Sequence, residues 1–169
     1  MNELAEVTDY LFICNLACLQ NLNLKKLNIS LVIAATLDLP SNLPEGVECV
    51  QVPVDDKHTM DISQYFDKVT ISILHAREKD EKSLVYCVAG VSRSATLVLN
   101  TLMTISGINL KDSHSILKSK RRFIRPNFGF WSQLCERELQ LFGHNSVVMV
   151  TSAIGAIPDL YKDEVDGML

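Results

Sequence analysis

A chain of 169 residues with 47% apolar and 21% charged side chains has the size and composition of one globular domain that needs no disulfide for stability. Its five cysteines, an odd number without regular spacing, exclude a disulfide framework and indicate a reducing compartment, so we expect a cytoplasmic protein that can also be nuclear. A net charge of −4 gives no general attraction for nucleic acid, and we expect neither a secretory signal nor a membrane span.

The first half of the chain alternates expected strands with an expected helix. Runs rich in apolar and β-branched residues predict strands over 10–15, 30–36 and 48–54, and a turn-rich loop covers 40–46. The helical spacing of apolar residues predicts a helix over 16–27.

The second half begins with a long amphipathic helix over 61–79 and a short central strand over 83–86. Three helices follow, over 93–105, 110–120 and 129–142, and the first is apolar nearly all round, which predicts that it is buried. Strands that alternate with helices favour an α/β layer fold, in which ligands bind at the C-terminal ends of the strands.

A loop in the middle of the chain carries the strongest chemical signal, because Cys87 precedes Arg93 by six residues between an apolar strand and a helix. Such a loop folds into a cup whose backbone N–H groups converge on an anion at the positive end of the helix dipole. Gly90 can supply the positive φ that a cup of this kind usually requires. The predicted phosphate-binding residues are Val88, Ala89, Gly90, Val91, Ser92 and Arg93.

Three side chains of this segment are the candidates for catalysis. Beside a helix N-terminus and a cation, Cys87 is expected to be a thiolate at neutral pH and to act as a nucleophile. Arg93 offers a planar fork of donors to two phosphate oxygens, and the hydroxyl of Ser94 could stabilise the thiolate as it departs. No spacing typical of metal ligands is found, so we expect no metal and no cofactor.

The segment around Cys87 resembles the signature of the cysteine-dependent protein phosphatases, and in particular the dual-specificity branch, whose pattern is His-Cys-x-x-Gly-x-x-Arg-Ser. Residues 52–56 with Tyr65-Phe66 are similar to the general-acid loop of that family and the helix after it. Residues 125–131 resemble the stretch that follows the signature in small, single-domain (atypical) members.

This resemblance extends from about residue 7 to 143 and implies one catalytic domain over 1–145. We expect an α/β fold with a central mixed, twisted sheet of about five strands flanked by helices, and the phosphate-binding loop between the central strand and the buried helix. The segment 146–169 is expected to pack on this domain up to about Tyr161 and then to fray.

A leaving serine, threonine or tyrosine oxygen must be protonated by a carboxylic acid, which the family takes from an aspartate upstream of the signature. Asp55 and Asp56 are adjacent candidates, and the spacing to Tyr65 favours Asp56. Asp55 falls where the family usually has a small residue, and its charge could perturb its neighbour. Both carboxylates could instead only solvate a surface loop or cap the helix that begins near Asp61.

Two further positions are expected to modulate the site. Tyr86 stands where the family has the histidine before the nucleophile, and a tyrosine there predicts a weaker thiolate and reduced turnover, unless it is only a core aromatic. Asn127 matches a family position and is expected to fasten its loop near the cup by hydrogen bonding. His58, close to the acid loop, has no predicted role.

One basic cluster follows the signature, and it is either a region that attracts acidic phosphosubstrates or a solvated helix end whose cations offset the helix dipole. The cluster consists of Lys118, Lys120, Arg121, Arg122 and Arg125.

The resulting prediction is a protein phosphatase of dual specificity in signalling, which hydrolyses phosphotyrosine and phosphoserine or phosphothreonine through a phosphocysteine intermediate. Its partners would be phosphoprotein substrates, phosphorylated kinases among them, and no oligomeric state is predicted. The doubled aspartate and Tyr86 leave open a weakly active or pseudo-enzymatic phosphoprotein-binding module. Redox signalling through Cys87 is a third hypothesis.

Overall fold

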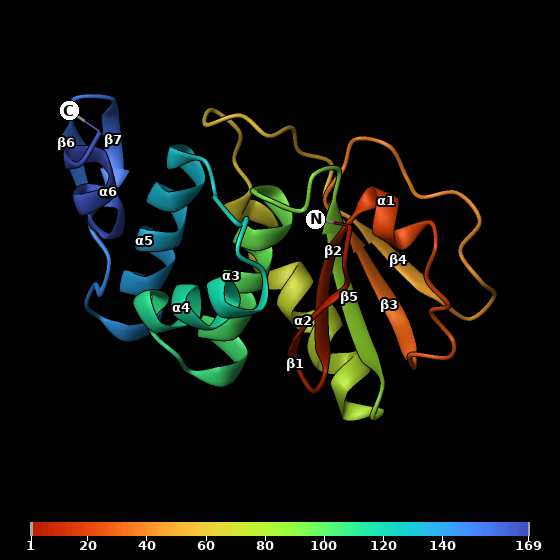
Figure 1. The fold of residues 1–169 in the computed structure, drawn as a ribbon. Helices are drawn as coiled ribbons and strands as arrows, with labels where there is room; N and C mark the ends of the chain where they lie inside the picture. The colour runs from red at the N-terminus through yellow and green to blue at the C-terminus, as the bar shows by residue number, and fades with distance from the viewer. Residues whose placement is uncertain (1, 169) are drawn as a thin grey trace.

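The computed structural model describes residues 2–168, which form layers on the two faces of one central sheet (Figure 1). The strand order across the sheet is β1 (Ala5–Thr8), β2 (Leu11–Asn15), β5 (Lys82–Cys87), β3 (Ile29–Ala34) and β4 (Glu48–Gln51). β1 runs antiparallel to β2, whereas the other neighbouring pairs are parallel. The predicted α/β fold with a five-stranded mixed sheet is confirmed.

Helices cover one face of the sheet in two layers (Figure 1). α2 (Phe66–Glu78) and α3 (Arg93–Ser106) pack directly on the strands, while α4 (Leu110–Lys120) and α5 (Phe128–Phe142) pack against α3. Ten residues of α3, from Ser94 to Met103, are buried, so the expected burial of this helix is confirmed. The loop that follows β5 therefore ends directly on a buried helix, because the first turn of α3 begins where that loop ends.

The opposite face of the sheet has a thinner cover, made of α1 (Leu16–Leu19) and the loops that connect the first strands (Figure 1). Successive side chains of a strand point to opposite faces. Tyr86 accordingly belongs to the apolar cluster of this thinner side, whereas its neighbour Cys87 belongs to the cluster beneath the helices. The end of β5 thus presents one residue to each side of the sheet.

The predicted helix over 16–27 is wrong, because only Leu16–Leu19 is helical. Asn15 caps this short helix by accepting the N–H of Cys18, and Asn21 and Asn23 lie just after it. The side chain of Asn23 accepts the N–H of Lys26 at 3.1 Å, which starts a new turn instead of continuing the helix.

Other boundaries differ by a few residues from those that we expected. The strand expected over 48–54 ends at Gln51, since Pro53 has no N–H to continue the ladder. The helix expected over 61–79 begins as a 3-10 turn, η1 (Ser63–Tyr65), before α2. β1 was not expected at all.

The C-terminal segment packs against α5 as a small unit of its own. It contains the hairpin β6 (Met149–Ser152) and β7 (Gly155–Pro158), the turn η2 (Asp159–Tyr161) and the helix α6 (Lys162–Asp166). Past Tyr161, where we expected fraying to begin, α6 buries the side chain of Val165, and the fraying of the end stays a prediction. The boundary expected at residue 145 stays a prediction, and the last residue lies outside the described residues.

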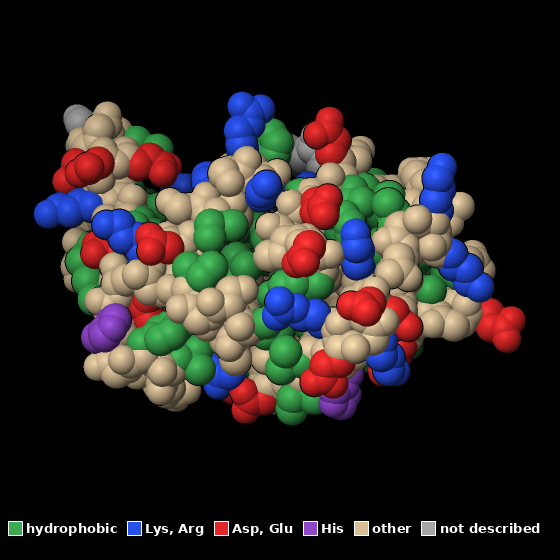
Figure 2. All heavy atoms as spheres, turned by 90° about the horizontal axis from the view of Figure 1, so that it is seen from below, with side chains coloured by type: hydrophobic (Ala, Val, Ile, Leu, Met, Phe, Trp, Pro, Cys, Tyr) green, Lys and Arg blue, Asp and Glu red, His purple; other side chains and the backbone are tan. Residues whose placement is uncertain are grey.

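Figure 2 shows one face of the molecule, on which acidic and basic side chains are interspersed rather than gathered by sign. Between residues 2 and 168, no helix combines the length and the apolar character that crossing a membrane requires.

Candidate active site

The loop between β5 and α3 turns its carbonyl groups outward. The carbonyl of residue 88 accepts the backbone N–H of Leu16 at 3.3 Å, and the carbonyl of residue 91 accepts that of Arg125 at 2.8 Å. Between them, the guanidinium of Arg121 donates to the carbonyls of residues 89 and 90 at 3.4 and 2.7 Å. A trans peptide unit directs its N–H opposite to its C=O. The N–H groups of residues 89–92 therefore point inward and form the predicted anion-binding cup.

Gly90 occupies the tightest part of this cup. Its φ is 66°, in the left-handed region that glycine tolerates best. A β-carbon at this position would lie 2.6 Å from Nη2 of Arg121 and 3.0 Å from the carbonyl oxygen of Cys14. Only glycine lets the loop close against both neighbours.

The sulfur of Cys87 lies at the centre of the cup. The residue is 2% exposed, and its Sγ accepts the N–H of Gly90 at 3.1 Å. The hydroxyl of Ser94 lies 3.1 Å from the same sulfur. The sulfur thus lies within hydrogen-bond distance of a backbone amide of the cup and of a hydroxyl in the first turn of α3.

The side chain of Arg93 lies beside the cup, where one of its N–H groups is bonded to the protein and another has no partner among the residues described. Its Nη1 donates to the carbonyl of Val54 at 3.1 Å, which ties the first residue of α3 to the acid loop. Its Nε is buried and has no hydrogen-bond partner among the residues described. This N–H can therefore donate to an oxygen of a phosphate bound in the cup.

A chain of hydrogen bonds connects Asp56 to the cup. The amide of Asn127 donates to Oδ1 of Asp56 at 2.9 Å, and the backbone N–H of Asn127 donates to the hydroxyl of Ser92 at 3.0 Å. The Oδ1 of Asn127 caps α5 by accepting the N–H of Phe130 at 2.9 Å. Asn127 thus touches the acid candidate and the cup at once, in the fastening role that we expected.

Asp55 has a different environment from its neighbour. Its carboxylate pairs with Nζ of Lys57 at 3.1 Å and accepts the backbone N–H of Asp56 at 2.9 Å. The hydrogen bond from Lys57 and that from the backbone hold the pKa of Asp55 below its usual value. A carboxylate kept ionised in this way is a poor proton donor, so the surroundings favour Asp56 as the acid.

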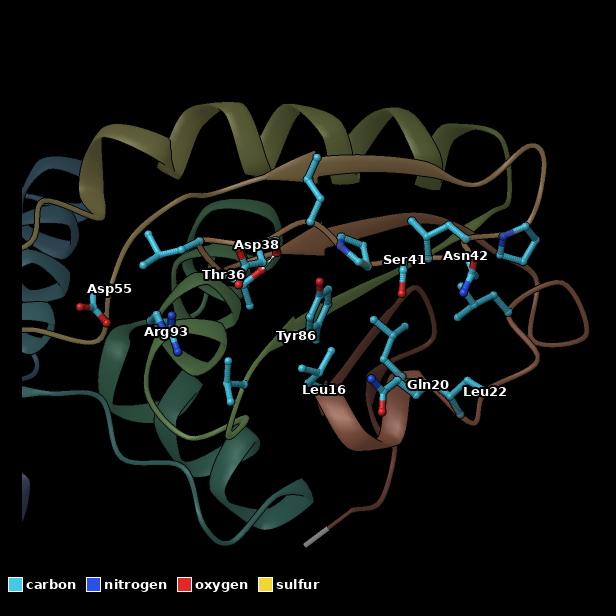
Figure 3. A pocket seen from close by; sticks show the side chains of 18 residues that line it. Leu16, Gln20, Leu22, Thr36, Asp38, Ser41, Asn42, Asp55, Tyr86 and Arg93 are labelled. Carbon is cyan, nitrogen blue, oxygen red and sulfur yellow. Dashed lines mark hydrogen bonds between the residues drawn. The ribbon is translucent and has the colours of Figure 1, made fainter.

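Tyr86 does not place its phenol at the sulfur. Its side chain is 1% exposed on the other side of the sheet from Cys87, where it lines a cavity (Figure 3). Burial raises the pKa of Tyr86, partly offset by a hydrogen bond with the side chain of Thr36. The phenol of Tyr86 therefore makes no hydrogen bond to the sulfur of Cys87, and the expected loss of turnover stays a prediction.

The acid loop docks on the start of α5 through contacts that the sequence did not indicate. The ring of His58 stacks on that of Phe128, with centroids 4.4 Å apart. A β-carbon on Gly129 would lie only 2.0 Å from the carbonyl oxygen of His58. Gln133 accepts the N–H groups of Ile62 and Ser63 at 2.9 and 3.0 Å. Asp56 thus sits in a loop that is fixed on both sides of its carboxylate.

We expect Gly129→Ala to reduce kcat for phosphoserine peptides by up to about 100-fold. The new methyl group must push the acid loop away, and a displacement of about 1 Å in a catalytic group can lower the rate by roughly that factor. The loss should be smaller for an aryl phosphate, whose leaving group needs less protonation. Steady-state kinetics with both substrates check this. Gly167→Ala is the matched control, since its methyl group would meet nothing nearer than 3.3 Å, and equal losses on both substrates contradict the positioning role.

Both interpretations of the basic cluster, a region that attracts phosphosubstrates and a solvated helix end, placed Arg121 at the surface, but the structure buries it. It is 5% exposed, and besides the cup carbonyls its guanidinium donates to the carbonyl of Glu3 at 3.1 Å. Lys118 donates to the carbonyl of Ile124 at 3.0 Å, and Arg125 pairs with Glu164 at 3.2 Å. The five residues therefore do not form one surface patch, and Arg121 stabilises the cup by donating hydrogen bonds to its carbonyls.

Selective alkylation of Cys87 is expected from the state of the other four cysteines. Desolvation by burial raises the pKa of Cys135 to about 12 and also raises the pKa values of Cys14, Cys18 and Cys49. These four remain protonated and poorly reactive at neutral pH, and they react only as the pH rises. Iodoacetamide should label Cys87 first, and inorganic phosphate should slow that labelling. Peptide mass spectrometry checks this, and earlier labelling of Cys135 contradicts it.

Within residues 2–168, no group of three or more histidine, cysteine, aspartate or glutamate side chains is placed to hold a metal ion.

Comparisons with known proteins point to one family. The model of the dual specificity phosphatase catalytic domain matches residues 11–140, which include the cup and the acid loop. Dual specificity protein phosphatase 18 of Bos taurus is 42% identical over 167 residues, covering 98% of this chain and 89% of the relative. Dual specificity protein phosphatase 14 of Mus musculus is 41% identical over 163 residues, covering 95% and 82%. The crystal structure of human DUSP28 is similar with a TM-score of 0.78 and 29% identity, covering 82% of this chain and 94% of that one.

Proposed function

Because the chain belongs to the dual specificity phosphatase family and is a dual-specificity protein phosphatase, we propose that it works through a phosphocysteine intermediate on Cys87. The observation that carries this proposal is a loop whose carbonyls all bond outward, around a sulfur that accepts the N–H of Gly90 at 3.1 Å. The cup is a P-loop shaped for the three terminal oxygens of a phosphate monoester, so phosphoproteins are its substrates.

In the first step, the sulfur of Cys87 attacks phosphorus and the bond from phosphorus to the serine, threonine or tyrosine oxygen breaks. The amides of the cup and the guanidinium of Arg93 hold the three other oxygens and stabilise the charge that they carry. Asp56 gives its proton to the leaving oxygen, so the dephosphorylated side chain departs neutral.

In the second step, a water molecule attacks the phosphorus of phosphocysteine and gives a proton to the carboxylate of Asp56. The bond between sulfur and phosphorus breaks, and the electron pair returns to Cys87 as a thiolate. The hydroxyl of Ser94, 3.1 Å away, can donate to that thiolate as it forms. Inorganic phosphate leaves, and both groups are back in their starting protonation states.

The link from Asp56 through Asn127 to Ser92 supports an enzyme rather than a phosphoprotein-binding module. A module that only binds phosphate needs no carboxylic acid linked to the cup in this way. The named relatives favour the enzyme as well.

The cellular setting belongs to the same proposal. All five cysteines are free thiols, which supports a reducing compartment, and we place the protein in the cytoplasm with access to the nucleus. Signalling phosphoproteins are then its substrates, and phosphorylated kinases are the candidates to examine first.

The experiment that tests the proposed function is hydrolysis of an aryl phosphate and of phosphotyrosine, phosphothreonine and phosphoserine peptides in the presence of a metal chelator. Release of phosphate from all four classes supports it. Activity that requires an added metal ion, or phosphopeptide binding without any phosphate release, overturns it.

A further inference from the structure

A cavity of about 710 Å³ opens directly beside the catalytic cup, on the thinly covered side of the sheet (Figure 3). It shares Val88 and Arg93 with the cup and Asp55 with the acid loop. Cavities that bind small ligands have volumes of about 300–1,000 Å³. A phosphorylated residue held at Cys87 therefore has its neighbours in the substrate at the mouth of a space large enough to receive a side chain.

The wall of this cavity combines leucines with polar side chains and is open to solvent. The leucines come from α1, from the segment just after it and from the loop after β3, and the ring of Tyr86 lies toward the centre (Figure 3). Leu37, Leu39 and Val88 are 58%, 61% and 54% exposed, although each is large and apolar. Covering them would remove apolar surface from water at the place where a substrate must pass.

The loop that forms the outer wall is ordered by its own hydrogen bonds. The amide of Gln51 donates to the carbonyls of Thr36 and Leu37 at 3.2 and 2.9 Å, and the hydroxyl of Thr36 donates to the carbonyl of Asp38. Pro40 and Pro44 restrict the backbone further along. The cavity is thus formed in advance, which lowers the entropy cost of binding.

The charged side chains that line the cavity favour an apolar group over an acidic one. Arg93 is the only cation among the lining residues described, and the proposed function assigns it to the phosphate in the cup. Asp38 and Asp55 add two carboxylates, and the pKa of Asp55 is held low by its hydrogen bond with Lys57. An acidic side chain or a second phosphate would meet like charge and no free cation here, whereas an apolar group meets leucine.

We propose that this cavity is a specificity subsite that binds a large apolar side chain adjacent to the phosphorylated residue of a protein substrate. The inference rests on the proposed function, since it places the phosphorylated residue at Cys87. Phosphoproteins with leucine, isoleucine, methionine or phenylalanine next to the phosphorylated residue would then be the preferred substrates.

The test uses phosphotyrosine and phosphothreonine peptides that are identical except for one residue, either leucine or its polar near-isostere asparagine, placed at each of the two positions on either side. At the position that reaches the cavity, we expect kcat/KM to be about tenfold higher with leucine. The same preference should appear in the dissociation constants measured with the full-length Cys87→Ser protein, which binds substrate without turnover.

The double substitution Leu37→Asp and Leu39→Asp should bring the leucine-to-asparagine ratio close to one. The matched control is Ile71→Asp, a residue of α2 that is 52% exposed outside the cavity, and this change should leave the ratio as it is. A ratio near one at every position in the wild-type protein overturns the subsite, as does a ratio that survives the double substitution. Better hydrolysis of phosphatidylinositol monophosphate in phosphatidylcholine vesicles than of any peptide also overturns it.

The two proposals fail in different ways. If leucine improves binding to the Cys87→Ser protein but the wild-type protein releases no phosphate, the subsite stands and the proposed function falls. If phosphate is released from every peptide at the same rate, the proposed function stands and the subsite falls.

Discussion

Replacing Cys87 by serine is expected to lower hydrolysis of every phosphate monoester by on the order of 10⁴-fold or more. A serine hydroxyl is not deprotonated at neutral pH, and the environment of the cup cannot make it a nucleophile comparable to a thiolate. The cup amides and Arg93 remain, so binding of a phosphopeptide should persist. Steady-state rates together with calorimetric binding of the same peptide measure both effects.

The matched control for this change is Cys135→Ser on α5, which lies outside the cup and should retain nearly full activity. Substantial turnover by the Cys87→Ser protein would mean that water attacks the phosphorus directly. Loss of peptide binding along with turnover would instead indicate that the cup had collapsed, which circular dichroism and the melting temperature can reveal.

Asp56→Asn is expected to lower kcat for phosphoserine and phosphothreonine peptides by about 10²–10⁴-fold, because an alkoxide leaves poorly without a proton. Asparagine keeps the size of the side chain and an oxygen for the amide of Asn127, so the loop should hold its position. With an aryl phosphate the first step should slow much less. Rates measured across a series of leaving groups therefore separate proton donation from loop structure.

Asp55→Asn is the matched control for Asp56→Asn, because it makes the same substitution at the neighbouring residue. The ion pair of Asp55 with Lys57 keeps it charged, so removal of its carboxylate should cost less than about tenfold. A larger loss in Asp55→Asn than in Asp56→Asn would assign the acid to Asp55 and refute the role derived for its neighbour.

The catalytic cup could be predicted from the sequence because its determinants are local. Cys87, Gly90 and Arg93 lie within seven residues, and a strand before them and a helix after them leave little freedom for the loop. The fold class followed in a similar way from the alternation of strands and helices. What the local pattern did not contain was the set of outward hydrogen bonds that turns the amides inward.

The missing features are contacts between residues far apart in the sequence. Arg121 bonds to Gly90 across 31 residues, and its position in a basic run predicted a surface residue instead. The approach of Gly129 to His58 leaves no pattern in one sequence, since each residue alone is unremarkable. Asn127 was predicted only because its motif resembles one in the family.

Boundaries failed where side chains compete with the backbone for hydrogen bonds. Asn21 and Asn23 were read as part of an apolar helical pattern, but asparagine readily forms local turns of the kind that follow α1. The cavity beside the cup was not predicted either. Its wall combines α1, the segment after it, the loop after β3 and residues of the cup, which are separate segments of the sequence.

The most direct test of the account is to mix an aryl phosphate with the Asp56→Asn protein, quench the reaction within the first turnover and locate phosphate by peptide mass spectrometry. The first step should proceed with this leaving group, whereas hydrolysis of the intermediate lacks its base. One phosphoryl group should therefore accumulate on the sulfur of Cys87. A phosphoryl group on any other residue, or release of the aryl alcohol with no covalent enzyme at any time, would contradict the mechanism.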